Sequence, residues 1–158
     1  MTPRIESLQP KKLIGKSVRM SLYDNKSGLL WTDFIPRLKE IDNRISNNRF
    51  SLQVYEPHHF ENFNPARQFE KWALIEVANF DNVPAGFETF DLTGGLYTVF
   101  THKGDTKEFQ KTAQYIYGVW LPNSEYNLDN RPHFEILGEK TKRDDPNSEE
   151  EVWIPIKQ

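Results

Sequence analysis

The sequence contains no cysteine, and this absence removes several kinds of chemistry at once. A chain without thiols forms no disulfides, holds no thiolate-bound metal and carries no cysteine nucleophile. It also lacks any apolar run near the ~20 residues that a membrane helix requires. Its first apolar pair, Leu13 and Ile14, is flanked by lysines and does not resemble a signal peptide. We therefore expect a cytoplasmic protein that does not contact a membrane.

The sequence also has no excess of positively charged residues. The 158 residues include 20 Lys and Arg against 23 Asp and Glu, and this net charge of −3 argues against general nucleic-acid binding. The length suits a single domain over residues 1–158. His58 and His59 are adjacent, so they would diverge in an extended chain, and no third ligand has a useful spacing. We expect no metal and no other cofactor.

Aromatic side chains are abundant by contrast. They make up 13% of the chain and include four Trp. Most rings in a small protein belong to its core, but a chain with this many can also line a cavity with some of them.

The order of the predicted elements repeats once along the chain. A strand at residues 12–22 precedes a helix at 29–45, which contains Pro36, and strands at 51–55 and 69–78 follow. The second passage has a short extended piece at 87–90, a strand at 96–102, a helix at 106–119 with Asp105 as its N-cap, and strands at 133–139 and 151–157. Residues 56–68 and the charged stretch 140–150 read as loops, the second one solvated. This order predicts an α+β fold of two β-α-β-β modules, about residues 1–80 and 81–158.

Alternation in the last two strands gives the first candidate site. Successive side chains of a strand point to opposite faces. Glu151 and Trp153 therefore share one face, and the aliphatic residues Val152, Ile154 and Ile156 share the other. If the strand containing Glu135 forms a hairpin with this one, Glu135, Glu151 and Trp153 lie on the same side of the sheet, away from the helices.

The strand at 69–77 has a similar pattern. Trp72 and Glu76 alternate with aliphatic residues, so we expect them to face away from the helices too, and Tyr55 of the preceding strand can join the same wall. Two interpretations stay open. The face is either a solvated outer side of an antiparallel sheet, or a pocket with aromatic walls and a carboxylate floor that suits cationic, planar or amphipathic ligands.

Four stretches together resemble one known family. They are FEKWALIEV at 69–77, PAGFETFDLTGGLYTVFTHKG at 84–104, WLPNSEYNLDNRPHFE at 120–135 and EVWIPIK at 151–157. Their order and spacing are similar to the GyrI-like family, the AraC-type effector-binding domain of bacterial transcription regulators. The resemblance spans nearly the whole chain, and it rests on the joint order of the stretches because no single motif is decisive.

The resemblance implies two modules related by a pseudo-twofold axis, with a ligand groove between them. It also implies that Glu135 is the pocket anion, and that Glu151 and Trp153 supply a second acid and a ring. Trp153 replaces the Tyr of many relatives, which removes a hydroxyl group and puts any mechanism that needs a phenol in doubt. Further aromatic wall residues match the family less securely: Trp31, Phe34, Tyr55 and Trp72.

Three functions follow from the resemblance. The first is a stand-alone sensor or sequestering module for amphipathic or cationic aromatic small molecules. The second is a hydrolase of strained electrophiles, in which Glu135 or Glu151 activates water. The third is a protein-interaction role, as in gyrase inhibition, carried by the acidic loop 144–151. Family regulators carry a helix-turn-helix before the sensor, but here the first strand begins within about a dozen residues of Met1, so we expect no direct DNA binding.

Overall fold

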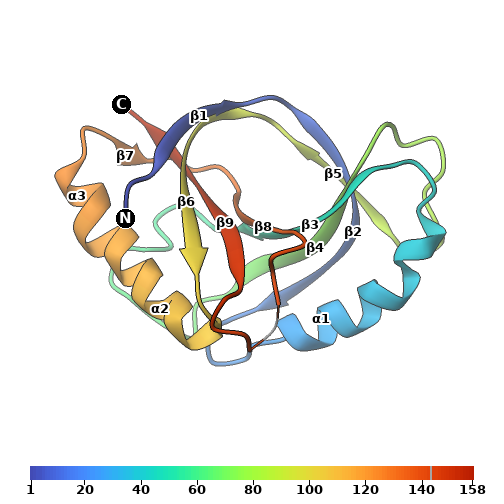
Figure 1. Cartoon of the computed structure of the whole chain (residues 1–158), viewed down its shortest axis with the longest axis horizontal. Coiled ribbons are helices and arrows are strands. Elements are labelled where there is room, and N and C mark those ends of the chain that lie inside the picture. The colour runs from blue at the N-terminus through green and yellow to red at the C-terminus, as the bar shows by residue number, and fades with distance from the viewer. Residues whose placement is uncertain (143) are drawn as a thin grey trace.

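The computed structural model describes residues 1–142 and 144–158. Arg143, which the sequence places in the charged loop 140–150, lies outside the described residues. The described residues form a curled antiparallel sheet with two helical segments on one face (Figure 1), which confirms the predicted α+β class. The strands are β1 (Arg4–Leu8), β2 (Lys11–Met20), β3 (Arg44–Val54), β4 (Phe69–Val77), β5 (Glu88–Leu92), β6 (Gly95–Lys103), β7 (Asn127–Leu128), β8 (His133–Leu137) and β9 (Glu149–Lys157).

Each helical segment changes its winding along its length. The first is α1 (Ser27–Phe34) followed by the 3-10 turn η1 (Ile35–Glu40), and the second is α2 (Thr106–Tyr115) followed by the π-helical turn η2 (Ile116–Trp120) and α3 (Leu121–Asn123). The side chain of Asp105 accepts hydrogen bonds from the amides of Lys107 and Glu108, which confirms the predicted N-cap. Among the described residues, no helix is long and apolar enough to span a membrane.

The strand order β1-β6-β9-β8-β3-β4-β2-β5 shows an internal symmetry. Strands β2, β3 and β4 with α1 correspond to β6, β8 and β9 with α2, and β3 and β8 meet at the centre. Strands β1 and β5, here called the crossed arms, each pair with the opposite half, β1 with β6 and β5 with β2. They arch over the side of the sheet that lies away from the helices (Figure 1). A Cβ on Gly94 would lie 2.1 Å from the Leu8 carbonyl oxygen, so the arms approach at a distance that only glycine permits.

The core is divided by the sheet. The inner side of the curl, under the crossed arms, holds a cluster that includes Tyr97, Phe134, Trp72 and Trp153. The opposite face carries two separate clusters, one under α1 around Phe34 and Ala73, and one under α2 around Phe100 and Val152. The strip of sheet between these two clusters is where the candidate site lies.

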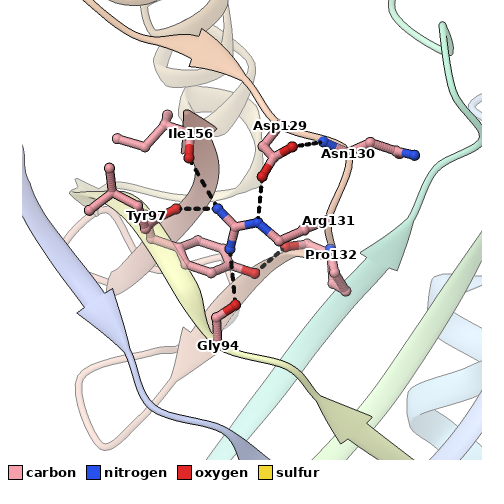
Figure 2. A network of polar contacts seen from close by, with 8 residues as sticks. Gly94, Tyr97, Asp129, Asn130, Arg131, Pro132 and Ile156 are labelled. Carbon is pink, nitrogen blue, oxygen red and sulfur yellow. Dashed lines mark hydrogen bonds and ion pairs between the residues drawn. The ribbon is translucent and has the colours of Figure 1, made fainter. Parts of the chain in front are cut away.

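Arg131 joins the chain before β8 to the base of β6 and the end of β9 (Figure 2). Its guanidinium donates to the carbonyl oxygens of Gly94 at 3.3 Å, Leu96 at 2.5 Å and Ile156 at 3.1 Å, and it pairs with Asp129 at 2.7 Å. It also lies 4.7 Å from the centroid of the Tyr97 ring, in cation–π range. One side chain therefore holds three segments of the second half together.

Several predicted boundaries were wrong. The helix predicted at 29–45 ends at Phe34, and η1 has Pro36 in its first turn, where a residue without an N–H is tolerated. Residues from Arg44 onward belong to β3, and Ile45, predicted on the apolar stripe of that helix, is 57% exposed. The helix predicted at 106–119 continues to Asn123, while β1 and β7 were not predicted at all.

Candidate ligand groove between the helices

A polar strip crosses the centre of the sheet on the helix-covered face. Ser51 of β3 is paired directly with Ala73 of β4 and with Glu135 of β8, and Glu135 is paired with Val152 of β9. Directly paired residues of neighbouring strands point to the same face. Ala73 packs under α1 and Val152 packs under α2, so Ser51 and Glu135 lie on the floor between the two helices.

The same register argument adds four more polar residues to this floor. Gln53 is paired with Lys71 of β4 and with His133 of β8, and Glu150 lies two residues before Val152 on β9. The term groove is used below for the candidate site made of this floor together with the rings at one end of it: Ser51, Gln53, Lys71, His133, Glu135, Glu150, Tyr55, Phe60 and Tyr117.

Lys71 is the cation beside the two acids of the floor, while Arg49 of β3 faces the same side but is paired with Ile75 and Leu137. The side chains of Lys71 and Glu135 are 11% and 14% exposed, and the ammonium nitrogen lies 4.0 Å from the Glu135 Oε1, which also accepts a hydrogen bond from Gln53 at 3.2 Å. Burial raises the pKa of Glu135 and lowers that of Lys71, and the opposite charge of each partner works against both shifts. Burial and the nearby charge of Glu135 raise the pKa of Glu150 to about 7. Two acids therefore share a single ammonium group.

Aromatic rings enclose one end of the floor. Phe60, from the long connection between β3 and β4, stacks on Tyr117 at 5.3 Å and on His133 at 5.4 Å between ring centroids. Tyr55 contacts Phe60 at 4.8 Å and His133 at 4.9 Å. The Tyr117 hydroxyl lies 3.0 Å from the His133 Nδ1.

These rings are uncharged at neutral pH. Burial lowers the pKa of His133 to about 3, and burial raises the pKa of both Tyr55 and Tyr117 above the usual phenol value. The negative charge of Glu135 adds to the pKa shift of both phenols, so the carboxylate lies within electrostatic reach of the wall. The groove combines a neutral aromatic wall with an acidic floor.

The predicted grouping of Glu135 with Glu151 and Trp153 was wrong. Across β8 and β9 the pairs are Phe134 with Trp153, Glu135 with Val152 and Ile136 with Glu151, so the register differs by one residue from the one that the grouping needs. A shift of one residue moves a side chain to the other face of the sheet. Glu135 therefore points to the helices, and Glu151 and Trp153 point away from them.

Of the other predicted site residues, one lies in the groove and three lie outside it. Tyr55 lies in the groove beside His133. Trp72 faces away from the helices as predicted, but with Trp153 it forms part of the inner core, where the two indoles are 8% and 5% exposed. Phe34, the last residue of α1, is fully buried, and the ring of Trp31 lies 5.9 Å from it between centroids.

Sequence reasoning missed Lys71, Glu150, Gln53, His133, Tyr117 and Phe60. A signal for Lys71 was present, because it interrupts the apolar positions of β4 that face the helices. Glu150 falls one residue before the strand start that the sequence predicted. Among the described residues, no cluster of three or more His, Asp or Glu side chains could hold a metal ion, and His58 instead pairs with Glu61 in an exposed position.

A buried acid beside aromatic rings, between two helices on a duplicated curled sheet, defines the class of small effector-binding domains. The chain matches the model of the Cass2 family, described as integron-associated effector binding proteins, over residues 4–156, and it belongs to this family. The resemblance to GyrI-like effector-binding domains is thereby confirmed.

Individual relatives extend the comparison. The chain is 29% identical to the transcriptional regulator BrlR of Pseudomonas aeruginosa over 99% of its own length, but it spans only 56% of that regulator. It shares its fold with the protein SAV2435 bound to tetraphenylphosphonium, with a TM-score of 0.72, 14% identity and coverage of 99% and 94% of the two chains. It also shares its fold with a hydrolase from Listeria innocua, with a TM-score of 0.65, 10% identity and coverage of 98% and 91%.

Proposed function

We propose that this protein binds an aromatic, positively charged small molecule in the groove between α1 and α2, with Glu135 as its principal counter-charge. The observation that carries the proposal is the pair of partly buried acids, Glu135 and Glu150, next to the single ammonium group of Lys71. A bound cation would supply the missing positive charge, and its rings would pack against Tyr55, Tyr117 and Phe60.

The physical terms favour this ligand class. Cation–π attraction is worth about 0.5–2 kcal/mol per ring, and it is strongest where water is excluded. A carboxylate in a poorly hydrated groove attracts a cation more strongly than it would in bulk water. The tetraphenylphosphonium bound by SAV2435 is itself an aromatic monocation, which supports the same class for this chain.

Calorimetric titration with tetraphenylphosphonium tests the proposal. We expect micromolar affinity for the wild-type protein, and a loss of at least about tenfold in Glu135→Gln, which keeps the shape of the side chain and removes its charge. Glu151→Gln is the matched control, because Glu151 lies on the other face of the sheet. Absence of binding, or equal losses in the two variants, would contradict the proposal.

We further propose that this binding serves a sensor or sequestering role. Membership of an effector-binding family and the similarity to the regulator BrlR support a sensor. The expected lack of direct DNA binding stays a prediction, and a gel-shift titration with random-sequence duplex DNA at physiological salt tests it.

A hydrolase remains the second candidate because of the proximity of Glu150 to Glu135. A carboxyl group with a pKa near 7 beside a second acid can accept a proton from water at neutral pH. The fold shared with the Listeria innocua hydrolase is consistent with such a role. Incubation with cyclopropane- and epoxide-bearing compounds tests this candidate, since ring opening by water adds about 18 mass units on a mass spectrum. Product formation that persists in Glu150→Gln and Glu135→Gln would exclude these residues as the base.

A further inference from the structure

Lys71 occupies a position where an apolar residue is expected. The other residues of β4 that face the helices are all apolar and buried: Phe69, Ala73, Ile75 and Val77. Lys71 itself is 8% exposed, and it is paired with Val18 on one side and Gln53 on the other. Burial of an ammonium group is costly unless it is well paired, and an apolar residue of similar size is often equally stable or more stable.

Pairing to Glu135 does not fully offset this cost. The separation of 4.0 Å is longer than the ~2.7–2.9 Å of a well-formed hydrogen bond between an ammonium group and a carboxylate. Stability alone therefore gives little reason for a lysine at this position. Its charge is instead placed beside the acids that we propose for ligand binding.

We infer that Lys71 selects ligands by their charge, so that the groove prefers one positive charge over two. The inference rests on the function proposed above. Glu135 and Glu150 carry two negative charges when both are ionised, and the neighbouring Lys71 ammonium group offsets one of them. A monocation would add one further positive charge beside these three side chains. A dication would place an excess positive charge close to the Lys71 ammonium group in a poorly hydrated groove, where repulsion is weakly screened.

The surroundings of Lys71 keep its ammonium group available for this role. Both acids of the floor favour its protonated form, and its side chain is 11% exposed. The polar neighbour Gln53 donates to Glu135, which holds the carboxylate beside the lysine. Two other cations of the neighbouring strands face the helices, Lys16 paired with Ala73 and Arg49 paired with Ile75. Lys71 is the cation whose charge lowers the pKa of both Glu135 and Glu150.

Titrations with three ligands of different charge test the inference. Tetraphenylphosphonium is the monocation, benzyl viologen is the aromatic dication, and triphenylphosphine oxide is the neutral compound. In Lys71→Met we expect the affinity to rise on the order of tenfold for the monocation and on the order of a hundredfold for the dication, because the repulsive energy that is removed is proportional to the charge of the ligand. The affinity for the neutral compound should change by less than about twofold.

Lys71→Arg provides the rescue, since it keeps the positive charge and should keep the wild-type ratio of monocation to dication affinity. Lys71→Gln replaces Lys71→Met if the latter does not fold, as judged by circular dichroism. An unchanged ratio in Lys71→Met or Lys71→Gln, with monocation binding still dependent on Glu135, overturns the role of Lys71 and leaves the proposed function intact. Loss of Glu135 dependence in the wild-type background overturns both.

Discussion

Phe134 of β8 and Trp153 of β9 are paired directly across the sheet, with ring centroids 5.3 Å apart and planes 15° from parallel. Both rings pack against Tyr97 on the inner side of the curl, at 5.3 and 5.8 Å. This pairing fixes the register of the two strands, and the register turns Glu135 toward the helices. The inner core and the orientation of the candidate ligand acid are thus set by the same contact.

The contact predicts that Trp153 supports stability without touching the ligand. Trp153→Ala should lower the free energy of unfolding by about 3–5 kcal/mol, as expected for removal of a buried aromatic side chain. Trp153→Phe keeps a ring opposite Phe134, so it should cost less and leave the tetraphenylphosphonium affinity within about twofold of the wild-type value. Urea unfolding and calorimetric titration measure the two effects. A Trp153→Phe protein that folds normally but loses tenfold or more in affinity would place this indole in the ligand site after all.

The sequence was sufficient for the class of fold and for part of the site. Alternation in β4 and β9 correctly separated Trp72 and Trp153 from the aliphatic residues that face the helices. The family resemblance pointed to Glu135, which lies on the groove floor. These features depend on periodicity within one strand or on ordered motifs, both of which can be read from one chain.

Features that depend on two strands could not be read in this way. The register of β8 against β9 decides whether Glu150 or Glu151 lies beside Glu135, and alternation is the same for either choice. Phe60 reaches the groove from a loop without periodicity, and its position depends on stacking against Tyr117, which is distant in sequence. The exchange of the crossed arms likewise depends on a close approach at Gly94 that no local pattern reveals.

Arg131 should be one of the largest single contributors to stability among the partly exposed residues. Arg131→Ala removes the donor for three carbonyl oxygens and leaves the Asp129 carboxylate without its ion-pair partner. Hydrogen bonds from a charged group contribute about 1.5–3 kcal/mol, so we expect a loss on the order of 3 kcal/mol in the free energy of unfolding. Arg131→Lys should recover only part of it, because an ammonium group cannot donate in the same planar fork.

Urea denaturation measures this loss, and Arg19→Ala is the control because Arg19 is exposed and makes a single contact of 3.4 Å to Gln68. A change of less than about 1 kcal/mol in Arg131→Ala would mean that the network of Figure 2 is replaced by water without cost.

Cation binding should strengthen as the pH rises through the pKa of Glu150, which is about 7. A proton on Glu150 competes with the ligand, so binding is weakest where the carboxyl group is protonated and levels off where it is ionised. Between pH 6 and pH 8 we expect a gain on the order of tenfold in the affinity for tetraphenylphosphonium, which has no titrating group of its own. Calorimetry at fixed ionic strength gives the profile.

Two variants locate the origin of this pH dependence. Glu150→Gln should flatten the profile, and Glu149→Gln should keep it, because Glu149 is the neighbouring acid on β9 and forms a pair with Lys140 at 3.9 Å. A profile that is unchanged in Glu150→Gln would assign the titration to another group of the groove.

His133 should make the protein sensitive to acid. Its pKa is lowered to about 3 in the folded state, mainly by burial, so the folded protein cannot take up the proton that the unfolded chain accepts below pH ~6.5. The stability that comes from a neutral His133 is therefore fully present above that pH and is lost as the pH falls toward 3. Between pH 7 and pH 4 this amounts to about 3 kcal/mol of the free energy of unfolding.

His133→Gln removes the titrating group and keeps a polar partner for the Tyr117 hydroxyl. Its urea midpoint should fall less between pH 7 and pH 4 than that of the wild-type protein, and the other acidic groups cancel because both proteins contain them. His58→Gln is the control, since the side chain of His58 is 77% exposed and should leave the wild-type difference unchanged. If His133→Gln and the wild-type protein lose equal stability on acidification, His133 is protonated in the folded state, and the aromatic wall would then carry a positive charge that opposes cation binding.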